Sequence, residues 1–163
     1  CLKAFKVHRR FVHLEFFRLL EDHPYLGKKG QVVGLEVNMR PSGGFTPDMI
    51  NFARETDVYK IWADMVAYDS TQKPVGTHHF CAFAGLRDGK DFALTPDDII
   101  EKYDDHLKMV ERMPDALADA MGNQMYLATF DTEEELHTFF ADVTKQKEPD
   151  VSVASETAET LES

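Results

Sequence analysis

In the segment GLEVNMR, residues 34–40, three different polar residues occupy alternate positions: Glu36, Asn38 and Arg40. Successive side chains of a strand point to opposite faces, so Glu36, Asn38 and Arg40 are predicted to share one face, with α-carbons about 6 to 7 Å apart. Carboxylate and amide oxygens suit Mg²⁺, which in proteins is usually completed by substrate phosphates. The guanidinium is a permanently charged fork that fits a phosphate or a carboxylate. The spacing therefore predicts a face that holds a metal ion and an anion together.

A second predicted strand, FVHLEFF at residues 11–17, adds an acidic group to this face. His13 and Glu15 lie on one side of it, and His13 is a metal ligand, a proton donor or a structural residue. An antiparallel pairing that is symmetric about Leu26 sets Glu15 directly across from Glu36, where two like charges repel each other. A cation between the carboxylates or a shifted pKa relieves this repulsion, and a different register avoids it. The opposite faces are predicted to be apolar, with an unbroken row on the second strand: Val33, Leu35, Val37 and Met39.

A helical segment follows the pair Gly43-Gly44. Thr46 is predicted to cap it, with Pro47 at its first position and Asp48 in its first turn. The helical pattern continues to Tyr68 and is interrupted near Asp57, which is suited to capping a second helix. The glycines permit close approach of the backbone to a ligand, and the N–H groups at a helix start attract anions.

The chain from Thr77 reads as a second unit. It alternates strand and helix patterns, with a turn at Asp88-Gly89. Strands are predicted at residues 78–86, 91–94 and 124–130, and helices beginning at Thr95, Pro114 and Thr132, the last with a capping box to Glu135. The fold class is therefore α+β, an antiparallel sheet flanked by helices followed by a small α/β extension. The predicted domains are residues 1–70, residues 71–145, and a disordered acidic tail at residues 146–163.

Composition limits the partners. The 163 residues carry a net charge of -11 and a pI near 5.0, which argues against nucleic acid and anionic membranes as partners. No run of about twenty apolar residues and no signal peptide is present, so a cytoplasmic protein is expected. The two cysteines, Cys1 and Cys81, are predicted to be reduced thiols.

Glu15 in HLEFF, the run Glu36, Asn38 and Arg40 in LEVNMR, and the glycine pair together resemble the C-terminal half of an ATP-grasp domain, over residues 2–68. The Glu-x-Asn-x-Arg pattern is similar to the biotin carboxylase and carbamoyl phosphate synthase branch. The resemblance implies that Glu15, Glu36 and Asn38 bind Mg²⁺ or Mn²⁺ and that Glu36, Asn38 and Arg40 bind ATP. It implies a catalytic role for Arg40, in contact with the reacting carboxylate or phosphate.

The implied activity is that of an ADP-forming ligase, which activates a small carboxylate as an acyl phosphate for attack by an amine or another nucleophile. In that family the glycine-rich loop and the lysines that grip ATP lie upstream, so the implied partner is an N-terminal part of the same protein. The resemblance leaves a homo-oligomer open. Residues 77–144 are similar to a C-terminal extension of bacterial ATP-grasp proteins of undefined substrate, a likeness that carries no functional residues.

Two other functions are compatible with the same residues. The first is a non-catalytic α/β binding or assembly module, in which the polar sheet face contacts a protein partner, since any half-buried antiparallel strand alternates polar and apolar residues. The second is an N-terminal cysteine hydrolase, which requires Cys1 at a strand end beside its free amine.

Overall fold

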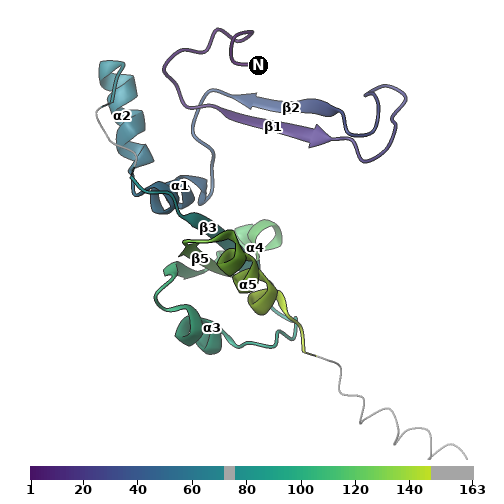
Figure 1. Ribbon diagram of the computed structural model, residues 1–163, viewed down its shortest axis with the longest axis vertical. Helices are drawn as coiled ribbons and strands as arrows, with labels where there is room; N and C mark the ends of the chain where they lie inside the picture. Colours follow the sequence, from purple (N-terminus) through teal and green to yellow (C-terminus); the bar gives the residue numbers. More distant parts are fainter. Residues whose placement is uncertain (72–75, 148–163) are drawn as a thin grey trace, which may run out of the picture. The chain divides into compact units, whose positions relative to one another are not determined.

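The computed structural model describes residues 1–71 and 76–147, and the chain divides into two compact units, Cys1–His79 and Phe80–Ser163. Each unit contains antiparallel strands and helices (Figure 1), which confirms the α+β class. The division falls after His79, later than the boundary predicted at residue 70. No helix among the described residues is long and apolar enough to span a bilayer.

The sheet of the first unit is a two-stranded ribbon. Strand β1 (His13–Arg18) pairs antiparallel with β2 (Val32–Asn38), close to the predicted strands. Glu15 lies directly opposite Glu36, which confirms the symmetric register. The register then shifts between Glu15 and Phe16, because Phe16 faces Gly34 and leaves Leu35 as an extra residue in β2. This is a β-bulge, an insertion that bends a strand and resets its alternation.

The bulge overturns the predicted unbroken apolar row on β2. Beyond it Val33 faces Phe17, whereas Val37 faces Leu14 on the other side of the bulge. Phe17 and Leu14 are three residues apart on β1, so they lie on opposite faces. Val33 therefore shares the face of Phe17 and not that of Val37. The prediction was wrong because strict alternation assumes a strand without an inserted residue.

Two short helices follow the ribbon: α1 (Thr46–Arg54) and α2 (Val58–Tyr68). The Asp57 carboxylate accepts a hydrogen bond from Lys60 N at 2.9 Å, which confirms Asp57 as the cap of α2. The predicted cap at Thr46 is wrong: α1 begins at Thr46, with Phe45 as a cap that makes no side-chain hydrogen bond. Proline lacks an N–H, and the N–H groups of the whole first turn have no partner within the helix. Pro47 is therefore tolerated at any position of that turn and does not show which residue begins the helix.

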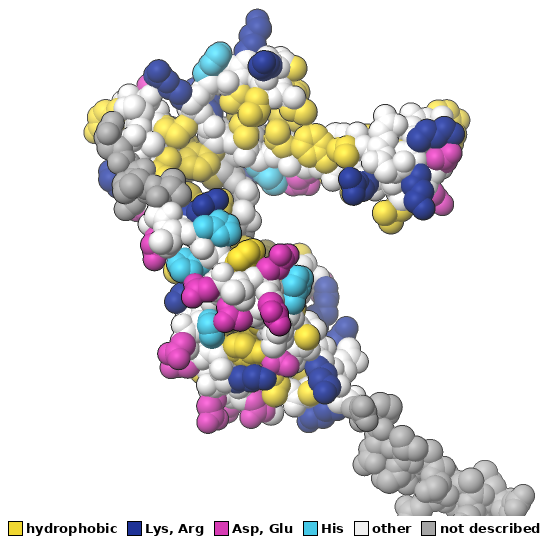
Figure 2. Space-filling model, viewed as in Figure 1, with side chains coloured by type: hydrophobic (Ala, Val, Ile, Leu, Met, Phe, Trp, Pro, Cys, Tyr) yellow, Lys and Arg dark blue, Asp and Glu magenta, His cyan; other side chains and the backbone are white. Residues whose placement is uncertain are grey.

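The first unit has almost no buried core. Among its described residues only Pro47 and Val58 are buried. Large apolar side chains lie on its surface instead, as Figure 2 shows for one face. On the ribbon Phe16 is 46%, Val32 56% and Leu35 56% exposed. A two-stranded ribbon that buries neither face is marginally stable in water. A layer that covers either face would therefore stabilise the ribbon.

The second unit is a three-stranded antiparallel sheet of order β3-β5-β4. Because β5 lies between β3 and β4, those two strands run parallel and form a split β-α-β unit with α3. Its elements are β3 (Phe80–Leu86), α3 (Pro96–Tyr103), β4 (Leu107–Arg112), α4 (Asp115–Met121), β5 (Gln124–Phe130) and α5 (Glu133–Thr144).

Helix starts in this unit were predicted well, and strands less so. Thr95 and Thr132 each cap a helix within a capping box, as their sequences indicate. The strand predicted at residues 91–94 is absent, and only Phe92 forms an isolated bridge, with Gln146. Lys147 N also donates to Asp91 O at 2.8 Å, so two residues assigned to the disordered tail are paired. The rest of that tail, residues 148–163, lies outside the described residues.

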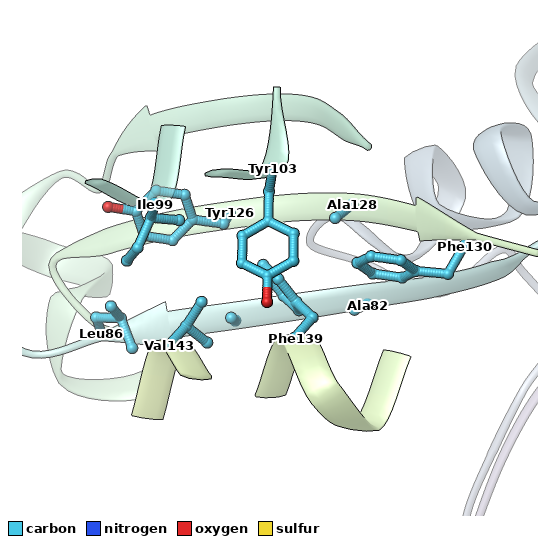
Figure 3. Close-up of a cluster of buried hydrophobic side chains, with 10 residues drawn as sticks. Ala82, Leu86, Ile99, Tyr103, Tyr126, Ala128, Phe130, Phe139 and Val143 are labelled. Atoms are coloured by element: carbon cyan, nitrogen blue, oxygen red, sulfur yellow. The ribbon is translucent and has the colours of Figure 1, made fainter. Parts of the chain in front are cut away.

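The core of the second unit lies between the sheet and two helices (Figure 3). Phe139 of α5 is fully buried, and its ring meets the Tyr103 ring edge-to-face at 5.0 Å between centroids. The buried cluster comprises Ala82, Ala84, Leu86, Ile99, Tyr103, Tyr126, Ala128, Phe130, Phe139 and Val143. On β3, Gly85 approaches α4 so closely that an added Cβ would lie 1.9 Å from the Met121 carbonyl oxygen. This position therefore excludes any side chain.

Candidate functional site

The ribbon brings four of the chemically versatile side chains onto one face. His13 lies directly opposite Asn38, and Glu15 directly opposite Glu36. Directly opposed residues of an antiparallel pair have α-carbons about 5 Å apart and side chains on the same face. We call the set His13, Glu15, Glu36 and Asn38 the polar face of the ribbon. All four lie on the same side of the bulge, so the local alternation that groups them is intact.

Each carboxylate of the polar face has a polar neighbour on its own strand. His13 Nε2 lies 3.0 Å from Glu15 Oε1, and Asn38 Nδ2 donates to Glu36 Oε1 at 2.5 Å. These two contacts place donor groups beside both anions, which offsets part of the repulsion between Glu15 and Glu36. No residue of the described segments makes a hydrogen bond or ion pair to the second oxygen of either carboxylate.

His13 has one ring nitrogen whose environment the sequence did not indicate. Its Nδ1 atom is buried and has no hydrogen-bond partner among residues 1–71 and 76–147. Buried ring nitrogens are normally hydrogen-bonded, and one without a partner calls for an explanation such as a ligand or a water. Since Nε2 faces Glu15, Nδ1 is the nitrogen left to accept a hydrogen bond or bind an ion. Alternation places His13 on this face, but the sequence does not reveal that Nδ1 is buried.

The donor chemistry of the polar face fits Mg²⁺ or Mn²⁺ shared with a phosphate ligand. Glu15 and Glu36 offer carboxylate oxygens, and with its nitrogen turned to Glu36 the Asn38 amide has its oxygen left to coordinate. In the described part of the chain no three or more His, Cys, Asp or Glu side chains cluster closely enough to hold a metal by themselves. Mg²⁺ typically takes one or two carboxylates and completes its shell with phosphate oxygens and water. The set is thus suited to an open site and not to a closed structural one.

Arg40 lies beyond the ribbon. Strand β2 ends at Asn38 and the backbone bends at Met39 and Arg40, so the alternation of the strand does not fix the face of Arg40. Its Nη1 donates to the Pro41 carbonyl oxygen at 3.0 Å, and it forms no ion pair with a described residue. The guanidinium is exposed and keeps donors for an anion, as a phosphate- or carboxylate-binding arginine requires.

The start of α1 is a weaker anion site than its sequence indicates. Pro47 has no N–H, and Met49 N already donates to Phe45 O at 2.9 Å. The Asp48 carboxylate occupies the first turn, where it would repel a phosphate. Gly44 adopts a left-handed conformation, with φ of 60°, so the loop does use its glycine to turn.

The cysteines do not form a site in the described structure. Both are free thiols, as predicted. Cys1 is exposed, and its carbonyl oxygen accepts a hydrogen bond from Phe5 N at 3.2 Å within a turn. It does not lie at a strand end, where a cysteine hydrolase requires it. Cys81 lies on β3, where burial raises the pKa of its thiol to about 11. A thiol with so high a pKa is a poor nucleophile at neutral pH.

No protein-family model matches the chain, and no curated protein matches it. The geometry of the polar face and the resemblance of its residues therefore carry the functional argument.

Proposed function

We propose that the polar face of the ribbon is the metal-binding part of an ADP-forming ATP-grasp ligase, which activates a small carboxylate as an acyl phosphate for attack by an amine or another nucleophile. The observation that carries the proposal is the register: Glu15 stands opposite Glu36, and Asn38 is one step further along the same face. An acidic residue on one strand beside a Glu-x-Asn pair on its neighbour is the arrangement that the resemblance requires.

Within this proposal Glu15, Glu36 and Asn38 hold Mg²⁺ or Mn²⁺, which when bound neutralises phosphate charge on ATP. Arg40 binds and orients an oxygen of the phosphoryl group or of the carboxylate, and its charge is the catalytic contribution of this chain. His13 positions the Glu15 carboxylate through the 3.0 Å contact. Phosphoryl transfer depends mainly on such positioning and charge neutralisation, and little on covalent help from the protein.

The exposed apolar side chains of the first unit support an upstream part of the same protein as its partner. The ribbon leaves Phe16, Val32 and Leu35 about half exposed, and a ribbon of two strands gains stability when another layer covers it. In an ATP-grasp ligase the upstream part would also provide the glycine-rich loop and the lysines for ATP. One surface would thus join the two halves of the active site.

The test is ADP release in the full-length protein that carries this ribbon, with a panel of carboxylates and amines and with Glu36→Ala. Loss of a metal-binding carboxylate is expected to lower kcat by at least about a hundredfold. Glu21→Ala, an exposed loop glutamate outside the polar face, is the matched control and is expected to retain activity. Retained circular dichroism in both variants shows that the fold survives. Wild-type turnover in Glu36→Ala refutes the assignment.

A binding or assembly module without catalysis is the second candidate, and the exposed apolar surface of the ribbon also favours it. Hydrogen exchange of the full-length protein separates the two. The ligase proposal predicts that Mg²⁺ or Mn²⁺ with ATP slows exchange in residues 32–38, because the metal ties the two strands together. A module predicts no change in this segment on adding the nucleotide.

A further inference from the structure

The second unit contains a hollow of about 430 Å³, and the proposed ligase function does not use it. It lies where the 87–92 loop and the beginning of α3 meet the ends of β3, β4 and β5. The volume is in the range of small-molecule sites, about 300 to 1,000 Å³. Its apolar wall is formed by Leu86, Phe92, Leu94 and Ile99.

Tyr126 of β5 also lines this hollow, and its hydroxyl is unpartnered. The side chain is fully buried, yet the hydroxyl has no hydrogen-bond partner in the described part of the chain. In Figure 3 the hydroxyl points past Ile99, away from Phe130 and toward the side where Leu86 lies. Burial, and secondarily the Asp97 carboxylate, raise the pKa of Tyr126, so at neutral pH it is a donor in need of an acceptor. Burying a hydroxyl without a hydrogen-bond partner is unfavourable.

The residues that line the hollow carry a more positive net charge than the chain as a whole. Arg87, Lys90, Arg112 and Lys147 line it, together with two carboxylates, Asp88 and Asp91. Arg112 and Asp88 neutralise each other in a two-point ion pair, with Arg112 Nη1 donating to Asp88 Oδ1 at 2.8 Å.

Two lysines remain available for an anion. Among the described residues the ammonium groups of Lys90 and Lys147 form no ion pair. The backbone holds Lys147 at the hollow, because its N–H donates to Asp91 O at 2.8 Å. Asp91 also lines the hollow, and two carboxylates at the beginning of α3 act on the same groups, Asp97 on Tyr126 and Asp98 on Lys147. The two lysines and Arg87 therefore balance the acidic groups around the hollow. In a chain of net charge -11 this balance is a local feature.

We propose that this hollow binds a small organic carboxylate. Its apolar body lies against Leu86, Phe92 and Ile99. One carboxylate oxygen accepts the hydrogen bond of the Tyr126 hydroxyl, and Lys90 and Lys147 balance its charge. A carboxylate supplies an acceptor for the Tyr126 hydroxyl and a negative charge for the two lysines that form no ion pair with described residues, whereas a neutral molecule supplies at most the acceptor.

The test is a protein-observed NMR titration of the 163-residue chain with butyrate, hexanoate and phenylacetate, each paired with its primary amide. We expect at least one of these carboxylates to shift the resonances of Leu86, Ile99 and Tyr126 with a Kd of about 1 mM. We expect its amide to bind at least about tenfold more weakly. If none of the three carboxylates binds there, or if amides bind equally well, the proposal is overturned. If the Tyr126 hydroxyl is instead satisfied by a buried water, none of the three carboxylates binds in the hollow.

Two variants assign the contacts. Tyr126→Phe removes only the hydroxyl from the core, so the unit is expected to fold with at least wild-type stability and to bind the carboxylate at least about tenfold more weakly. The pair Lys90→Ala and Lys147→Ala is expected to abolish the preference for acid over amide. Lys108→Ala, an exposed lysine outside the hollow, is the control and leaves binding unchanged. Unchanged affinity in Tyr126→Phe contradicts the proposed hydrogen bond.

Discussion

The opposition of Glu15 and Glu36 predicts an electrostatic coupling that a double-mutant cycle measures. The variants are Glu15→Gln, Glu36→Gln and the double substitution, compared with the wild type in metal-free buffer. Glutamine keeps the size and polarity of glutamate and removes its charge. Each single substitution is expected to raise the free energy of opening of the ribbon, because it removes the repulsion between the two carboxylates. The second substitution then adds less than the first.

The magnitude follows from the register. Two unit charges about 5 Å apart in a water-like dielectric interact by about 0.8 kcal/mol. Cross-strand pairs contribute about 0.2–1 kcal/mol, and like charges oppose pairing. His13 and Asn38 beside the carboxylates lower the repulsion further. We expect a coupling of about 0.5 kcal/mol that falls in 1 M salt, where the screening length is only about 3 Å.

Hydrogen exchange of the amides in β1 and β2, followed by NMR or by mass spectrometry of peptides, is the assay. Glu21→Gln in the connecting loop is the control and is expected to leave the exchange of both strands unchanged. If the single substitutions are strictly additive, or if the coupling favours the charged pair in the absence of metal, the two carboxylates do not repel each other across the ribbon.

Four further outcomes are expected for the second unit. Phe139→Ala removes a fully buried ring and is expected to lower the free energy of unfolding by about 3–5 kcal/mol, measured by urea denaturation; a loss below 1 kcal/mol contradicts the packing. Gly85→Ala places a Cβ against a backbone carbonyl and is expected to destabilise the unit or prevent its folding, whereas a wild-type melting temperature contradicts the close approach. Hydrogen bonds, first the one from Lys102, hold the pKa of the Asp142 carboxyl below its ordinary value. The carboxylate therefore stabilises the fold fully above the ordinary pKa, and this stabilisation is lost as the pH falls through the lowered pKa. Asp142→Asn is expected to make the free energy of unfolding fall less steeply at acid pH, and an unchanged fall contradicts this. Burial raises the pKa of Cys81 from 9.0 to about 11, so at pH 8 the thiolate fraction is about a hundredfold smaller in the folded protein than in urea. Alkylation of Cys81, monitored by mass spectrometry, is expected to be slower in the folded protein by at least the same factor. Equal alkylation rates contradict the burial.

Much of the candidate site could be predicted from sequence, because strand alternation and pairing symmetry are local rules. They placed Glu15 against Glu36 and grouped Asn38 with them. The same rules failed at Leu35, since a bulge is decided by the pairing of two strands and not by the sequence of one. They also failed to follow Arg40, because the strand ends two residues before it.

Helix caps in the second unit were predictable for a similar reason. Thr95 and Thr132 bond to groups three residues away, within a single turn. Strand β4 was missed because Lys108 and Arg112 lie exposed among its few apolar residues. Its pairing also has an irregularity between Leu107 and Met109. The unpartnered hydroxyl of Tyr126 had no sequence signal, because its burial depends on residues distant along the chain.

The most direct test of the central claim is titration of the 163-residue chain with Mn²⁺, observed as paramagnetic line broadening in NMR spectra. Two carboxylates and an amide without phosphate bind weakly, and this method detects weak binding. We expect preferential broadening at Glu15, Glu36 and Asn38, its reversal by excess Mg²⁺, and its loss in Glu36→Gln but not in Glu21→Gln. Uniform broadening over all exposed carboxylates, or unchanged broadening in Glu36→Gln, would contradict the claim that the polar face binds a metal ion.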